Sequence, residues 1–178
     1  MPKKTRSNPR RTKSTSSRAR AGKAAAEAAS SRVGKLRHAL QEAASGLTHQ
    51  SDSYYPFRFF SLPSEGKEDL TAEGFLIRLG ISQQAIDEFE LPVTKLIEEQ
   101  PLEDFLPTLE YLANTGGVDT SDPEEIADAK QFTRLEALLK KRLRDVKVFR
   151  VGFIEVRCYI AGFYGKDIAG LVTTSIET

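Results

Sequence analysis

The 178-residue chain has one cysteine, Cys158, and two histidines, His38 and His49. A single thiol excludes a disulfide framework and a cysteine-rich zinc site, and it favours a reducing compartment. No apolar run approaches the roughly 18–20 residues that a membrane-spanning helix needs. The basic start is not followed by the short apolar core of a secretory signal, so we expect no such signal.

The residue patterns of common enzymes are also missing. Neither histidine has a nucleophile or a carboxylate pair at a recognisable spacing, and no glycine-rich phosphate loop occurs. Cys158 lies within an apolar segment, which favours a small buried side chain over a nucleophile. The sequence therefore predicts that the protein is not an enzyme and has no cofactor of its own.

Charge divides the chain into two parts, although its net charge is only +1. Residues 1–37 contain twelve Lys or Arg and one acid, Glu27. From His38 to the end, 14 basic and 24 acidic residues remain, a net charge near −10. The pattern predicts a basic tail attached to an acidic domain, and the two parts suggest different partners.

The tail, residues 1–30, has almost no large apolar side chains and is predicted to be disordered. Its basic clusters are typical of a nuclear localisation segment or a phosphate-binding arm, and they comprise Lys3, Lys4, Arg6, Arg10, Arg11 and Lys13. The same composition suits an organelle transit peptide, or a solvated extension without a role. We expect a nuclear or cytoplasmic protein, with an organelle as the alternative.

Residues 31–178 are predicted to form one domain. The elements expected in its first half are a helix over Ser31–Ser45 stopped by Gly46, a strand in "YYPFRFFSL" entered through Pro56, a short helix from Thr71 to Gly80, another helix from Ser82, an extended piece near Lys95–Ile97 and a helical turn at "LEDFL".

The clearest element is the helix in "SDPEEIADAKQFTRLEALLKKRLR". Ser121 or Asp122 can cap it, Pro123 suits its first position, and acids and bases complement the dipole at its two ends. Its predicted buried stripe comprises Ile126, Ala129, Phe132, Leu135, Leu139 and Leu143. Turn signals after it, at Gly152 and "GFYGKD", predict three antiparallel strands, and "DIAGL" is expected to turn at Gly170. Helices followed by a sheet indicate an α+β or layered α/β/α domain.

The last two residues, Glu177 and Thr178, supply a carboxylate, a hydroxyl and the α-carboxylate. Mg²⁺ and Ca²⁺ prefer such oxygen ligands. An acidic surface can also dock into a basic groove built for phosphates, because complementary potential favours that encounter. A protein that combines both features would be a nuclease inhibitor.

Two stretches, "GLTHQSDSYYPFRFF" and "VFRVGFIEVRCYIAGFYGKDIAGLVTTSIET", resemble the nuclease A inhibitor family, and the resemblance spans residues 31–178. It implies a three-layer α/β/α sandwich like the class-one pathogenesis-related proteins. It also implies inhibition of a sugar-non-specific endonuclease of the ββα-metal type by plugging its active-site groove. Thr178 would then give oxygen to the nuclease's Mg²⁺, the only metal contact expected. The implied partner-binding residues are Ser51, Asp52, Ser53, Glu177 and Thr178.

The chain departs from this family at three points. Asp52 stands where the family has a glutamate, no tryptophan is present to press on the nuclease, and the basic tail is additional. Two alternatives therefore remain. One is a nucleic-acid- or chromatin-associated adaptor whose tail contacts phosphates weakly while the domain recruits a protein. The other is an enzyme of the same fold. No membrane partner is expected.

Overall fold

The computed structural model describes residues 30–50, 54–64, 69–81, 96–115 and 122–177. The predicted tail, the helix expected from Ser82 and the predicted site residues 51–53 and 178 lie outside these ranges. The chain divides into two units, residues 1–35 and 36–178. Residues 30–43 are helical, and their last eight residues begin the second unit, to which the rest of this description applies.

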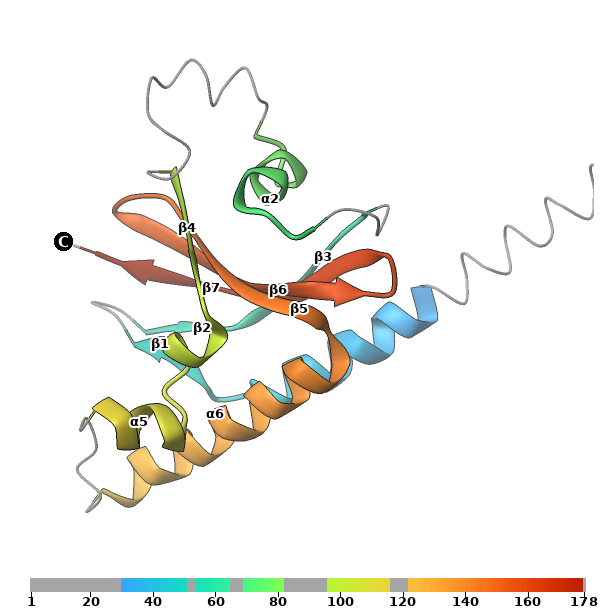
Figure 1. Cartoon of the computed structure of the whole chain (residues 1–178). Coiled ribbons are helices and arrows are strands. Elements are labelled where there is room, and N and C mark those ends of the chain that lie inside the picture. Colours follow the sequence, from blue (N-terminus) through green and yellow to red (C-terminus); the bar gives the residue numbers. More distant parts are fainter. Residues whose placement is uncertain (1–29, 51–53, 65–68, 82–95, 116–121, 178) are drawn as a thin grey trace, which may run out of the picture. The chain divides into compact units, whose positions relative to one another are not determined.

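The described residues of the second unit form two antiparallel sheets and several helices (Figure 1). The small sheet pairs β1 (Thr48–Gln50) with β2 (Tyr54–Pro56). The five-stranded sheet has the order β3-β7-β6-β5-β4, with β3 at Arg58–Leu62, β4 at Ile97–Gln100, β5 at Arg144–Val151, β6 at Glu155–Tyr164 and β7 at Asp167–Ile176. The mixed α and β class and the three antiparallel C-terminal strands are confirmed.

The order of elements corrects the expectation of helices first and a sheet later. β3 and β4 come from the first half of the chain and form the two edges of the large sheet. The single strand expected in "YYPFRFFSL" is two strands in different sheets, separated at the buried Phe57. Pro56 has no N–H to donate to a ladder, which is why a strand pairing ends there.

Two of the helices begin where the sequence signals placed them. In α2 (Ala72–Arg78), the Thr71 hydroxyl accepts a 3.2 Å hydrogen bond from the N–H of Gly74. In α6 (Pro123–Arg142), the Asp122 carboxylate accepts from the N–H of Glu124 at 2.8 Å. The turn expected at "LEDFL" is a 3-10 helix, η1 (Leu102–Asp104). Among the described residues, no helix has the length and apolar content to cross a membrane.

One helix, α5 (Leu109–Thr115), was not predicted. Pro107 just before it obscures the helical pattern, and the helix is short. The hydroxyl of Thr108 caps it by accepting a 3.2 Å hydrogen bond from the N–H of Tyr111. The N–H of Leu109 donates to the Thr133 hydroxyl of α6, which joins the two helices.

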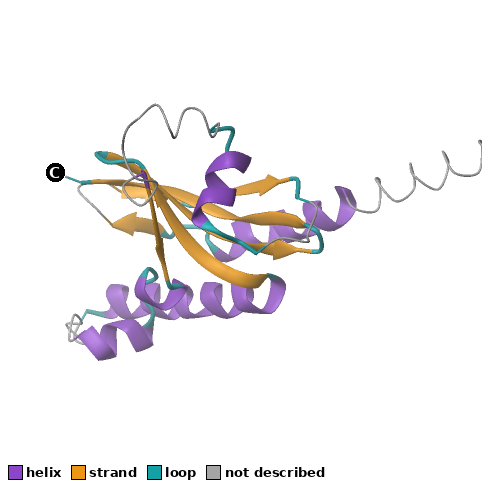
Figure 2. Cartoon of the chain, turned by 45° about the horizontal axis from the view of Figure 1, so that its top comes forward, coloured by secondary structure: helices purple, strands orange, loops and turns teal. Residues whose placement is uncertain are grey.

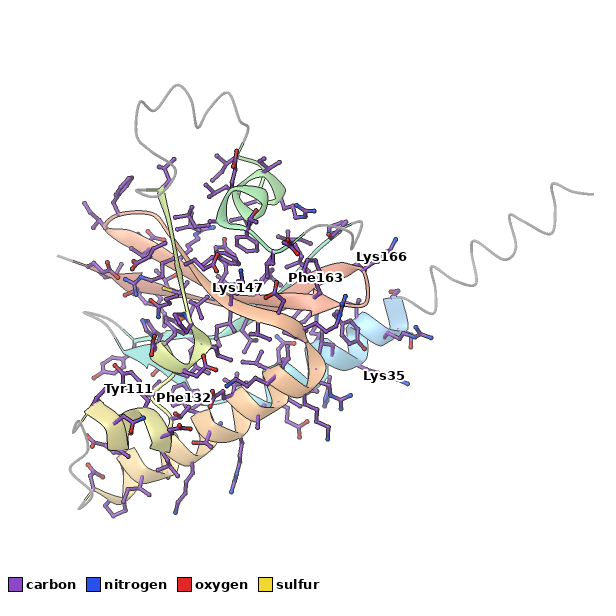
Figure 3. The ribbon with its side chains drawn as sticks, viewed as in Figure 1. Lys35, Tyr111, Phe132, Lys147, Phe163 and Lys166 are labelled. Carbon is purple, nitrogen blue, oxygen red and sulfur yellow. The ribbon has the colours of Figure 1, made fainter. Side chains whose placement is uncertain are left out.

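Apolar clusters cover both faces of the large sheet. On one face, α6 and the helix over 36–43 pack against alternate residues of β6, Cys158 and Ile160. The predicted stripe of α6 is buried except at Ile126, which is half-buried. Phe132, which α6 points toward the sheet in Figure 3, meets the ring of Phe57 edge-on at 6.1 Å.

The other face is covered by α2, as Figures 1 and 2 show. Phe75 of α2 stacks on Phe149 with ring centroids 4.6 Å apart and meets Tyr159 edge-on. Burying an aromatic side chain of this size contributes about 1.5–3 kcal/mol. The Nζ of Lys147 donates to the carbonyl oxygen of Leu70 at 3.1 Å, which fixes the segment before α2 to the sheet.

Gly170 does not form the expected turn, because "DIAGL" belongs to β7. The residue pairs with Phe60 on one side and Ala161 on the other. A Cβ at this position would overlap the carbonyl oxygen of Ile160. The close packing expected of Gly170 is therefore real, but it occurs between two central strands. The turn itself lies at Gly165, whose φ is +65°.

Candidate functional site

Of the predicted partner-binding residues, Glu177 lies within the described ranges, directly after the last residue of β7. Glu155, the first residue of β6, pairs with Ile176, the last residue of β7. The Thr173 hydroxyl of β7 donates a 3.1 Å hydrogen bond to the carbonyl oxygen of Tyr55 in β2. The end of β7, the turn before β6 and strand β2 are thus joined, and Figures 1 and 2 show them on one side of the domain. We call this region, residues 54–55, 152–154 and 176–177, the β7 end.

Glu177 is held at the β7 end by three contacts. Its N–H donates to the carbonyl oxygen of Ile154 at 2.9 Å. Its carboxylate forms an ion pair with the guanidinium of Arg150 and accepts from the Ser175 hydroxyl at 3.4 Å. The Arg150 side chain is only 21% exposed, and its Nε also lies 3.5 Å from Glu98. A contact of Glu177 with a partner stays a prediction, but its carboxylate already has partners within the protein.

The turn between β5 and β6 exposes two large apolar side chains. Phe153 is 55% exposed and Ile154 is 72% exposed, while Tyr54 at the start of β2 is 70% exposed. The turn is tight, since Gly152 has φ +119° and a Cβ there would lie 2.5 Å from the Glu155 carbonyl oxygen. The N–H of Gly152 also donates a 3.2 Å hydrogen bond to the carbonyl oxygen of Leu96. Phe153 and Ile154 therefore lie on a turn that is hydrogen-bonded to Leu96 and packed closely against Glu155.

Sequence reasoning identified Gly152 as a turn signal but missed Phe153 and Ile154. The signal available was two large apolar residues directly after the turn glycine. Their side chains resemble those of the core in type, so composition could not separate an exposed pair from a buried one.

A hollow of about 340 Å³ lies beside the β7 end. Residues of β2, β3, β6 and β7 line it, and they include Arg58, Glu155, Arg157 and Thr174. Guanidinium, carboxylate and hydroxyl groups together suit hydrogen bonds to polar side chains of a protein partner. The described charged side chains that line the hollow are of both signs.

Of the three side chains considered for catalysis, Cys158 is buried, His49 is half-buried and His38 is exposed. Burial raises the pKa of the Cys158 thiol to about 11, which keeps it protonated and unreactive at neutral pH. Burial, and then the positive charge of Arg150, lower the pKa of His49, whose ring stacks on Phe105 at 4.8 Å. His38 is exposed beside Glu42. Within the described ranges, no group of three His, Cys, Asp or Glu side chains could hold a metal ion.

These features are those of a protein-binding domain: a packed sheet with both faces covered, and one end that exposes apolar side chains beside fixed polar groups. The comparison with known families agrees. A family model described as nuclease A inhibitor-like protein matches residues 34–178, so the chain belongs to the nuclease A inhibitor-like family. This family comprises nuclease inhibitors rather than enzymes, and membership implies a nuclease partner. A search of curated proteins found no match.

Proposed function

We propose that the protein inhibits a sugar-non-specific, metal-dependent endonuclease of the ββα-metal type by inserting the β7 end into its active-site groove. The observation that carries the proposal is the family match, which spans both resembling motifs. Thr178 gives oxygen to the nuclease's Mg²⁺, and Asp52, flanked by Ser51 and Ser53, contacts the groove. The near −10 charge of residues 38–178 guides the domain toward a groove that binds phosphates.

The geometry of the β7 end supports this proposal. Residues 51–53 connect β1 to β2, and Thr178 follows Glu177, so both predicted contacts continue from described parts of this end. Exposed aromatic and aliphatic side chains commonly anchor protein interfaces. Tyr54, Phe153 and Ile154 would supply the apolar contact for which the chain has no tryptophan. The packing of helices on both sheet faces supports the three-layer α/β/α sandwich that the resemblance implies.

The test compares chain-end variants against a ββα-metal endonuclease. Adding a few residues after Thr178 should abolish inhibition, because the added bulk moves the terminal oxygen away from the Mg²⁺. Deleting Glu177 and Thr178 should weaken binding and remove its dependence on Mg²⁺. Asp52→Ala should weaken binding by about 1–3 kcal/mol through a lost charge-assisted hydrogen bond. Titration calorimetry with and without Mg²⁺, beside a DNA-cleavage assay, measures all three.

Equal inhibition by the wild type and the extended chain would contradict the proposal, since the terminus would then not enter the groove. A protein that inhibits no such nuclease but loses DNA binding when residues 1–30 are removed would instead be the nucleic-acid-associated adaptor.

A further inference from the structure

Arg150 joins strands that are distant in the sheet. It lies on β5, where it pairs with Glu98 of β4 on one side and Cys158 of β6 on the other. Its guanidinium reaches past β6 to the carboxylate of Glu177, which directly follows β7. The same guanidinium lies beside Glu98, with 3.5 Å between Nε and Oε2. One side chain therefore connects an edge strand to the end of the chain.

Glu177 needs two attachments to have a single orientation. The hydrogen bond from its N–H to the carbonyl oxygen of Ile154 holds the backbone beside the β5–β6 turn. The ion pair with Arg150 holds the side chain. The Ser175 hydroxyl, 3.4 Å from the same carboxylate oxygen, adds a third contact. Together the three contacts hold both the backbone and the side chain of Glu177.

A contribution to folding stability alone accounts poorly for this arrangement. The Glu177 side chain is 41% exposed and that of Glu98 is 69% exposed. Ion pairs this accessible to solvent typically contribute about 0–1 kcal/mol to stability. Ordering a binding segment before association has a larger effect, because it removes an entropic cost that binding would otherwise carry.

We propose that Arg150 is a positioning residue that holds Glu177 and thereby aligns the chain end for insertion into the nuclease. The inference rests on the proposed function, in which the residue after Glu177 is a metal ligand. Arg150 itself touches neither nuclease nor metal in this mechanism. Its substitution should therefore change the order of the chain end and the strength of inhibition while leaving the fold intact.

The experiment uses the full chain with Arg150→Gln, the conservative Arg150→Lys and a matched control, Arg134→Gln, at an exposed position of α6. Amide hydrogen exchange measured by NMR reports on the N–H of Glu177, with the amides of β6 as internal reference. Arg150→Gln should speed exchange at Glu177 about tenfold without changing the β6 amides, and should weaken nuclease inhibition by a similar factor. Arg150→Lys should restore part of the slow exchange at Glu177 and part of the inhibition. Arg134→Gln should change neither the exchange nor the inhibition.

Unchanged exchange at Glu177 in Arg150→Gln would overturn the proposal, because Arg150 would not hold the residue. Faster exchange with unchanged inhibition would overturn it too, since alignment would then not matter for binding. If the wild type inhibits no nuclease, the proposed function fails, while the exchange measurement still decides whether Arg150 holds Glu177.

Discussion

The middle of the β6–β7 pair and the β7 end belong to the same domain but differ in the burial of their side chains. In the middle, Cys158–Phe163 and Ile168–Leu171 are all buried, because apolar clusters cover both sheet faces. At the end, Phe153 and Ile154 are exposed, and Arg150 and Glu177 form a charged pair. We expect folding to depend on the middle and, under the proposed function, partner binding to depend on the end, so substitutions should separate the two properties.

The largest effect is expected in the middle, at Gly170. Gly170→Ala places a Cβ against the Ile160 carbonyl oxygen, so the two central strands must move apart. We expect the free energy of unfolding to fall by about 3 kcal/mol or more, measured by urea denaturation.

The matched control for Gly170 is Gly165→Asn in the β6–β7 turn. Nothing lies within 4 Å of a Cβ at Gly165, and asparagine tolerates its positive φ. This variant should lose less than about 1 kcal/mol. Equal free energies of unfolding for the two variants would show that the close approach of β6 and β7 does not exclude a side chain at residue 170.

The next effect is expected at the β7 end. Replacing Phe153 and Ile154 together with serine should weaken nuclease binding by about 2 kcal/mol, the range of interface residues that anchor a complex. The free energy of unfolding should change by less than about 0.5 kcal/mol, since both side chains are largely exposed. Calorimetric titration and urea denaturation of the same preparation measure the two quantities.

Ile77→Ser is the control for the apolar pair, because Ile77 is 48% exposed on α2, away from the β7 end. A loss of nuclease affinity in this control as large as in the double variant would show that general apolar exposure, and not the β7 end, determines binding.

The smallest effect is expected at His49 of β1. Burial and Arg150 lower its pKa from the ordinary 6.5, so the folded protein favours the neutral ring. As the pH falls below 6.5, the unfolded chain binds a proton first, and stability decreases until the pH passes the lowered folded pKa. Each unit of pKa difference corresponds to about 1.4 kcal/mol.

His49→Phe keeps a ring against Phe105 and should reduce the loss of stability that begins as the pH falls through 6.5, measured by urea denaturation at each pH. His38→Gln, at an exposed histidine, should leave the loss unchanged. A wild-type slope that His49→Phe does not reduce would assign the pH dependence to other groups.

Local signals made α2 and α6 predictable. Thr71, Asp122 and Pro123 mark helix starts through side-chain and backbone preferences that act within one turn. The short α5 escaped this reasoning, since Pro107 interrupts its pattern and its cap, Thr108, resembles any loop residue. Helix boundaries were therefore predictable where capping residues or a first-turn proline mark the helix ends.

By itself, the sequence determined the long helix, the three C-terminal strands, the tight turn at Gly152 and the resemblance of its two end motifs to nuclease inhibitors. Only the tertiary structure decided that β3 and β4 form the sheet edges, that Gly170 lies within a strand, and that Phe153 and Ile154 are exposed. It also decided that Arg150 reaches Glu177 across β6, 27 residues along the chain. The physical reason is range: caps and turns depend on neighbouring residues, whereas strand order, burial and ion pairs depend on groups that only the folded sheet brings together.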